Sequence, residues 1–144
     1  MEKILGLDLG SQTLGMAYYD GVVDIVHPIE NYTFEPGNFK KARTHIIEYC
    51  KKENITNVVL GYPLNMDGTK SKRTLSTERF KEDLLKEAPN LNIFYCDERL
   101  TTVEAYERLD MMGVNKKKQK ELIDMISSVI ILESYISKKK EGKL

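Results

Sequence analysis

An aspartate stands inside the apolar segment 4–9 near the start of the chain. The alternation of a β-strand would place Leu7 and Leu9 on one face and Asp8 on the other. Aspartate is a poor strand former, and a buried carboxylate without a partner is costly. Asp8 therefore either binds a cation or caps the glycine-containing turn that follows, and this segment alone gives the two alternatives about equal weight.

A second acidic group, Asp97 and Glu98, follows the apolar run 93–96. If this run is a parallel strand, both acids stand just beyond its carboxyl end, which is the edge where open α/β sheets bind ligands. The alternative is a solvated loop in which one of the acids pairs with Arg99. For this tripeptide in isolation, the solvated loop is the simpler interpretation.

A third acid, Asp124, lies in the last expected helix, and its face continues through Ser127 and Ser128. Small side chains let a helix approach a strand closely, and the strand that carries Gly6 and Asp8 is a suitable partner. Such packing would bring Asp124 towards Asp8. The alternative is an exposed acid in the first half of a helix, which needs no function.

Asp8, Glu98 and Asp124 could therefore meet at one edge of a sheet, and such a cluster needs cations. A site made only of oxygen ligands suits Mg²⁺ or Mn²⁺. A pair of such ions can stabilise the attacking and the leaving oxygen of a phosphoryl displacement. We expect the three acids to serve as catalytic residues and as metal ligands together.

The elements that would position these acids follow a mixed α/β order. Three strands open the chain and are expected to be antiparallel, with Pro28 indicating an edge position or an early end for the third. Helices and strands then alternate, which predicts a parallel arrangement and a mixed five-stranded sheet with helices on both faces. The expected strands are 3–9, 16–19, 22–34, 57–61 and 93–96, and the expected helices begin near residues 39, 75, 101 and 115.

Local signals set some of the boundaries. Asn38 and Asn115 are candidate N-caps, and the string from Thr101 to Glu104 has the pattern of a capping box. Residues 67–74 show no apolar period and predict a mobile loop, in which Asp67 with its following glycine favours a tight turn.

The composition is that of an ordinary globular protein. The chain has 144 residues, which fits a single domain spanning 1–144. Its 22 basic residues balance its 22 acidic residues, so only local patches could attract a polyanion. The two cysteines lack metal-ligand spacing, and no apolar window predicts a signal peptide or membrane span, which favours a cytoplasmic location.

Three strings occur in an order that resembles the YqgF/RuvX family, described as Holliday junction resolvases or pre-16S ribosomal RNA nucleases. They are GLDLG at 6–10, GYPLNMDGT at 61–69 and DERLTT at 97–102, and the resemblance continues through residue 135. It implies a ribonuclease H-like fold, an acidic triad at Asp8, Glu98 and Asp124, and Mg²⁺- or Mn²⁺-dependent hydrolysis of structured nucleic acid. Processing of the 5′ end of pre-16S rRNA is the favoured activity. Resolution of a Holliday junction in DNA recombination is the alternative, and it would require a homodimer rather than a monomer.

The chain departs from the family pattern directly after its first motif. Family members usually carry lysine and arginine there, whereas this chain has Ser11, Gln12 and Thr13. The departure predicts that a basic contact near the acidic centre is absent, which bears on substrate affinity more than on the chemistry.

Basic residues elsewhere could hold the phosphates of a nucleic acid. The candidates lie in two clusters, and charge runs of this kind are otherwise solvated helix ends. The candidates are Lys70, Lys72 and Arg73 in the first cluster, and Lys116 and Lys117 in the second, which continues through Lys118 and Lys120.

Two functions of other classes stay open at this point. The string at 6–13 also resembles the phosphate loop of sugar kinases and actin-like ATPases, although those enzymes close two related domains over ATP and this chain has the length of one. The second open function is that of a non-catalytic module, which binds structured RNA or a processing partner without cleaving it.

Overall fold

The computed structural model describes residues 2–143, so the end residues 1 and 144 of the expected domain lie outside the described residues. Five strands and four helices occur in this part of the chain. In chain order they are β1 (Ile4–Leu9), β2 (Thr13–Tyr19), β3 (Val26–Thr33), α1 (Phe39–Glu53), β4 (Asn57–Tyr62), α2 (Lys72–Glu87), β5 (Asn92–Asp97), α3 (Thr101–Met111) and α4 (Lys116–Lys140).

The five strands form one mixed sheet in the order β3-β2-β1-β4-β5. β1 and β3 pair antiparallel with β2, whereas β4 pairs parallel with both β1 and β5. β3 is an edge strand, which suits Pro28 because the missing N–H of proline is tolerated there. The expected sheet, three antiparallel strands followed by two parallel ones, is confirmed.

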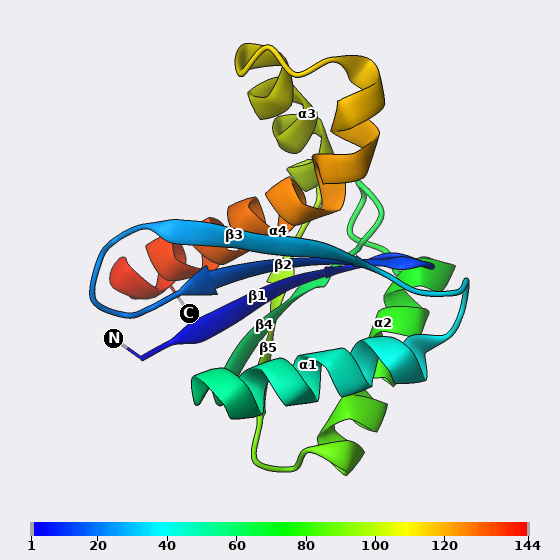
Figure 1. Cartoon of the computed structure of the whole chain (residues 1–144), viewed down its shortest axis with the longest axis vertical. Helices are drawn as coiled ribbons and strands as arrows, with labels where there is room; N and C mark the ends of the chain where they lie inside the picture. The colour runs from blue at the N-terminus through cyan, green and yellow to red at the C-terminus, as the bar shows by residue number, and fades with distance from the viewer. Residues whose placement is uncertain (1, 144) are drawn as a thin grey trace.

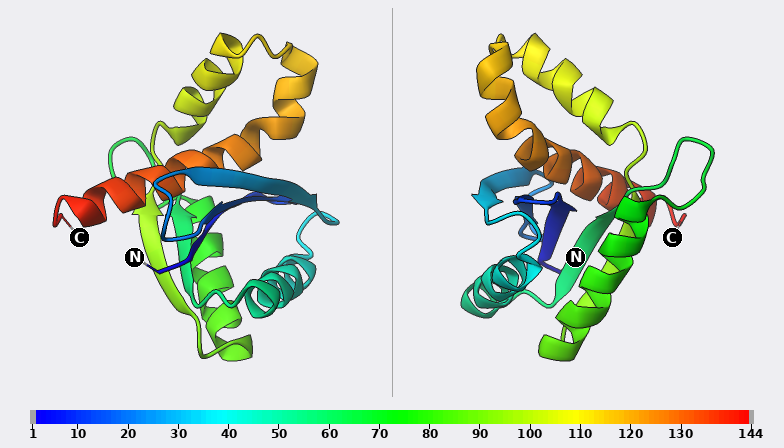
Figure 2. Two further views of the ribbon diagram at one scale, coloured as in Figure 1. Left: turned by 60° about the vertical axis from the view of Figure 1, so that its left-hand side comes forward. Right: turned by 90° about the vertical axis from the view of Figure 1, so that its right-hand side faces the viewer.

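Helices cover both faces of the sheet, as expected (Figures 1 and 2). One core includes Leu5 and Leu7 of β1 and the buried residues of α1 and α2, and the second joins the other face to α4. The alternation of β1 therefore sends its leucines towards α1 and α2 and its glycine and aspartate towards α4. A Cβ atom on Gly6 would lie 2.8 Å from Cβ of Leu132, so α4 packs directly on the backbone of β1.

The two helices after β5 form a hairpin that projects from the sheet (Figure 1). α3 packs against α4, and the second half of α4 returns across the sheet. Among the described residues, no helix has the length and apolar character needed to cross a bilayer.

Two strand boundaries differ from expectation. β2 begins at Thr13, because the bond from the Gly10 amide to the Thr13 carbonyl closes the turn earlier than expected. β3 begins at Val26 rather than residue 22, because the carboxylate of Asp20 accepts the amides of Val22 and Val23 in a turn.

One helix start and two expected caps also need correction. α2 begins at Lys72, with Ser71 as its N-cap in a capping box with Thr74, so residues 72–74 are helical and not loop. The expected capping box at Thr101 is wrong, because Thr101 is already helical and Leu100 precedes it with a positive φ of 69°. Asn38 makes no side-chain cap, whereas the expected cap by Asn115 is confirmed through its bond from the Lys118 amide.

Candidate active site

Asp8 lies near the carboxyl end of β1 and is 3% exposed. Its antiparallel partner on β2 is Gly15. A Cβ atom on Gly15 would overlap the backbone carbonyl of Asp124, so α4 crosses the sheet at this position. The glycine thus lets α4 pack on β2 next to Asp8, which brings Asp124 beside it.

Glu98 follows β5, and its amide donates to the carbonyl of Tyr62 at 3.3 Å, which fixes it at the end of β4. Its side chain then passes over Gly61, where an added Cβ would lie 2.6 Å from Oε2 of Glu98 and 2.7 Å from Cδ1 of Ile131. Because Gly61 has no side chain, the Glu98 carboxylate can reach across β4 towards β1. The side chain of Glu98 is only 9% exposed.

A guanidinium group lies between these two acids. Nη2 of Arg73, from the first turn of α2, is 3.4 Å from Oδ1 of Asp8 and 3.8 Å from Oε1 of Glu98. The same nitrogen donates a hydrogen bond of 3.0 Å to the carbonyl of Leu9. A positive charge therefore does reach the acidic centre, and it comes from α2 rather than from the turn at residues 11–13.

Asp124 lies on the α4 side of the centre. The hydroxyl of Thr13 donates to its Oδ2 atom, which orients the carboxylate from β2. Ser128, one turn further along α4, is fully buried and donates to the carbonyl of Met125. The small residues after Asp124 therefore serve close packing, as the sequence indicated.

The acids interact electrostatically as one group. Burial, with the charge of Glu98 next, raises the pKa of Asp8 well above its ordinary value. Burial also raises the pKa of Glu98, although its hydrogen bond with Asp8 and the charge of Arg73 act in the opposite direction. The charge of Asp124 raises the pKa of both. With no divalent ion bound, burial and mutual repulsion favour the protonated form of this pair, and the larger rise in pKa is that of Asp8.

Asp8 and Glu98 fit a divalent cation chemically, because they are buried oxygen donors that already hold a positive group between them. The three acids together are more widely spaced than this pair. Within residues 2–143, no three His, Cys, Asp or Glu side chains lie close enough together to hold one metal ion. Asp8 and Glu98 thus form the closer pair, with Asp124 beside them.

A groove of about 740 Å³ opens over this centre. It is lined by Asp8 and Asp124, by the turn between β1 and β2, and by residues of α2, α3 and α4. Of the basic residues predicted to bind phosphate, the structure places Lys72 and Arg73 in the groove, joined by Lys120. Lys120 belongs to the second basic cluster of the sequence and lies one turn before Asp124.

The other predicted basic residues lie away from the groove lining. Lys70 makes an ion pair of 2.9 Å with Glu78, and Lys116 makes one of 3.3 Å with Asp110. Lys117 lies on the exposed first turn of α4. Their phosphate contacts remain predictions.

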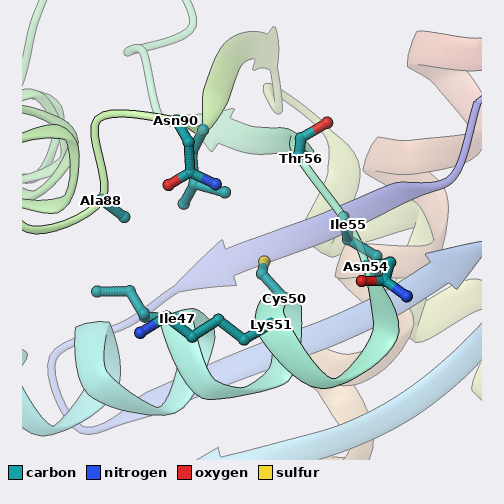
Figure 3. Close-up of a pocket in the computed structure, with 9 residues that line it drawn as sticks. Ile47, Cys50, Lys51, Asn54, Ile55, Thr56, Ala88 and Asn90 are labelled. Carbon is teal, nitrogen blue, oxygen red and sulfur yellow. The ribbon is translucent and has the colours of Figure 1, made fainter.

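A second pocket, of about 320 Å³, lies at the opposite end of the sheet (Figure 3). Cys50 lines it from α1, with Ile55 and Ala88 nearby. Burial raises the pKa of the Cys50 thiol to about 11, so the reactive thiolate is suppressed near neutral pH. Its only charged lining residue is Lys51, so this pocket lacks the paired carboxylates that make the groove over Asp8 the candidate active site.

Sequence reasoning missed three parts of this site. The contact of Arg73 with the acids depends on the start of α2 at residue 72, which the expected loop concealed. The roles of Gly15 and Gly61 depend on what packs above them. A glycine inside a strand pattern is a signal of close approach, and it could have directed attention to both positions.

The sequence has close relatives along nearly its full length. A protein of Mycoplasmopsis pulmonis provisionally named as a pre-16S rRNA nuclease is 38% identical over 138 residues, covering 95% of this chain and 93% of the relative. A protein of Ruminiclostridium cellulolyticum with the same provisional name is 35% identical over 136 residues, covering 94% of each chain.

Solved structures share the fold at low sequence identity. Thermus thermophilus RuvC in complex with a Holliday junction has a TM-score of 0.67 at 12% identity, covering 99% of this chain and 97% of RuvC. The fowlpox virus resolvase bound to junction DNA has a TM-score of 0.59 at 15% identity, covering 96% and 99%. The expected ribonuclease H-like fold is therefore confirmed. The RuvX family, described as Holliday junction resolvase, matches residues 2–138, and the chain belongs to this family.

Proposed function

We propose that this protein is a metal-dependent endonuclease that hydrolyses phosphodiester bonds of structured RNA, with precursor 16S rRNA as its substrate. The observation that carries the proposal is the pair of largely buried carboxylates, Asp8 and Glu98, which share the positive charge of Arg73 beside a groove that Asp8 and Arg73 line. Family membership makes the protein a hydrolase of nucleic acid. The provisional names of the relatives favour ribosomal RNA as the substrate.

In this proposal Asp8 and Glu98 are the main metal ligands, and Asp124 completes the set. Mg²⁺ or Mn²⁺, when bound, would polarise the scissile phosphate and stabilise the departing oxygen. The hydroxyl of Thr13 donates a hydrogen bond to the Asp124 carboxylate and so fixes its orientation. Asp8 must lose its proton before it can act as a ligand, because metal binding requires the ionised carboxylate.

The groove walls would hold the substrate on either side of the carboxylates. Lys72 on α2 and Lys120 on α4 both line the groove, so they can contact phosphates that flank the scissile one. Tyr106 and Thr102 of α3 line the same groove, which gives the projecting hairpin a part in substrate contact. Lys70, Lys116 and Lys117 would add more distant phosphate contacts.

A four-way DNA junction is the second candidate substrate. It is favoured by the family description and by the fold shared with RuvC bound to a junction. Two symmetric cuts in a junction would need two copies of this chain. The proposed RNA cleavage needs only one.

The test is a cleavage assay with a pre-16S rRNA transcript and a four-way DNA junction side by side, with Mg²⁺, Mn²⁺ or EDTA. We expect site-specific cleavage of the transcript with metal, little cutting of the junction, and loss of cleavage in Glu98→Gln and Asp124→Asn. Preferential cutting of the junction would reassign the substrate to DNA. Equal cleavage in EDTA, or equal activity of both variants, would exclude the proposed metal centre.

A further inference from the structure

Arg73 occupies the place where a cation between Asp8 and Glu98 would bind. Its Nη2 atom lies 3.4 Å from Oδ1 of Asp8 and 3.8 Å from Oε1 of Glu98. Those oxygens are the ones that a divalent ion would take at about 2.0–2.1 Å for Mg²⁺. One guanidinium and one metal ion cannot share these positions, because like charges at such a separation repel strongly.

The side chain of Arg73 can move out at the cost of its bond to the Leu9 carbonyl, whereas its backbone is held. The Arg73 carbonyl accepts from the hydroxyl of Thr77, and Ser71 caps the first turn of α2. In contrast, the Arg73 side chain is 51% exposed, whereas those of Asp8 and Glu98 are 4% and 9% exposed. Displacement would therefore move the guanidinium outwards into the groove that Arg73 itself lines, and leave the acids where they are.

We propose that Arg73 is an internal counter-cation that offsets the charge of the Asp8–Glu98 pair before metal binds, and that the divalent ion displaces it into the groove, where it contacts a substrate phosphate. The inference rests on the proposed function, because it assumes that Asp8 and Glu98 bind the metal. A guanidinium matches a phosphate through two parallel hydrogen bonds, so the displaced group has a natural partner on the substrate. Metal binding and substrate binding are then coupled through one side chain.

The test is calorimetric titration of Mn²⁺ into the full chain, comparing wild type with Arg73→Gln, Arg73→Lys, Lys72→Gln and Asp8→Asn. Without its competitor, the Arg73→Gln protein should bind Mn²⁺ at least about fivefold more tightly than wild type. Arg73→Lys should return the affinity towards the wild-type value, because it restores the charge. Lys72→Gln, which removes a neighbouring charge that contacts neither acid, should change the affinity by less than about twofold because solvent screens it.

The outcomes separate this inference from the proposed function. Loss of Mn²⁺ binding in Asp8→Asn, together with equal or weaker binding by Arg73→Gln, would overturn the role of Arg73 and leave the metal site intact. Equal tightening by Lys72→Gln and Arg73→Gln would also overturn it, because general electrostatics would then account for the effect. Unchanged Mn²⁺ binding in Asp8→Asn, or no binding by any variant, would overturn the metal site and the displacement together.

Discussion

The two ends of one sheet carry opposite kinds of buried group. At the carboxyl ends of β1, β4 and β5, Asp8 and Glu98 are buried with Arg73 between them. At the opposite ends of β4 and β5, the buried groups include Ile55, Leu91 and the protonated thiol of Cys50.

The difference shows how one fold separates stability from chemistry. Burying apolar side chains stabilises the native state, whereas burying carboxylates opposes folding unless their charge is compensated. Apolar side chains at the positions of Asp8 and Glu98 would therefore give a more stable fold. The presence of acids there is explained by function and not by stability. Substitutions at the two ends should then differ in sign and in kind.

The largest expected effect is at Asp8. Asp8→Asn keeps the shape of the side chain but removes a charged metal ligand, so we expect cleavage to fall by about a thousandfold or more. Single-turnover cleavage in Mg²⁺ measures this loss, and circular dichroism checks that the variant is folded. Activity within a few fold of wild type would remove Asp8 from the mechanism.

Gly15→Ala should cause the largest loss of stability. The added Cβ would overlap the backbone carbonyl of Asp124. A backbone atom cannot rotate aside as a side chain can, so the overlap is relieved only if α4 moves away from β2. We expect a loss of about 3 kcal/mol in the free energy of unfolding, measured by urea denaturation, with reduced cleavage. Unchanged stability would mean that α4 does not cross β2 at this glycine.

Gly61→Ala should affect activity more than stability. Its Cβ would meet the ends of two flexible side chains, at 2.6 Å from Oε2 of Glu98 and 2.7 Å from Cδ1 of Ile131. Side chains can move, so the stability loss should be only about 1 kcal/mol. The displaced carboxylate should nevertheless lower cleavage by about a hundredfold. A stability loss as large as that of Gly15→Ala, with normal cleavage, would contradict this role of Gly61.

The stability of the acidic end should depend on pH. Because the folded-state pKa of Asp8 is raised, mainly by burial, the native state holds a proton that the unfolded state releases above its ordinary pKa of 3.8. Stability of the wild type therefore falls as pH rises from that value through the folded pKa. In EDTA, Asp8→Asn should melt a few degrees above wild type at pH 7.5 and lose this advantage near pH 4. An advantage that grew as pH fell would contradict the sign of the shift.

Cys50→Ala should produce the smallest effect and serves as the matched control at the opposite end. The cavity left by one sulfur atom should cost about 1 kcal/mol, as is typical of a point substitution. Cleavage per folded molecule should be unchanged, because Cys50 lies at the far end of the sheet from the carboxylates. Reduced cleavage by a fully folded Cys50→Ala protein would show that the two ends of the sheet are coupled, which contradicts their separate roles.

The number of strands and the arrangement of three antiparallel strands followed by two parallel ones could be predicted from the sequence, because local pattern indicates each element, whereas the position of β4 beside β1 could not. Apolar runs gave β1, β4 and β5, and Pro28 marked β3 as an edge. Boundaries were less certain, because hydrogen bonds that no period reveals decide them. Ser71 and Thr74 begin α2 earlier than its apolar residues suggest, and Leu100 starts α3 without a capping side chain.

The acids of the candidate site could also be picked out from the sequence, because Asp8 and Glu98 stand at the ends of apolar runs and Asp124 is followed by small residues on its helix face. Their surroundings could not. The contact between Arg73 and Asp8 joins residues that are 65 positions apart, and the bond from Thr13 to Asp124 joins residues 111 apart. Such contacts depend on the packing of α2 and α4 on the sheet, which single-sequence patterns do not specify.

The most direct test of the central claim is a crystal structure of the protein grown with Mn²⁺ and measured for anomalous scattering. The account predicts an anomalous peak within bonding distance of Asp8 and Glu98, with Asp124 turned towards it and the Arg73 guanidinium moved out into the groove. A peak elsewhere with Arg73 still between the two acids, under conditions in which the protein cleaves RNA, would contradict it.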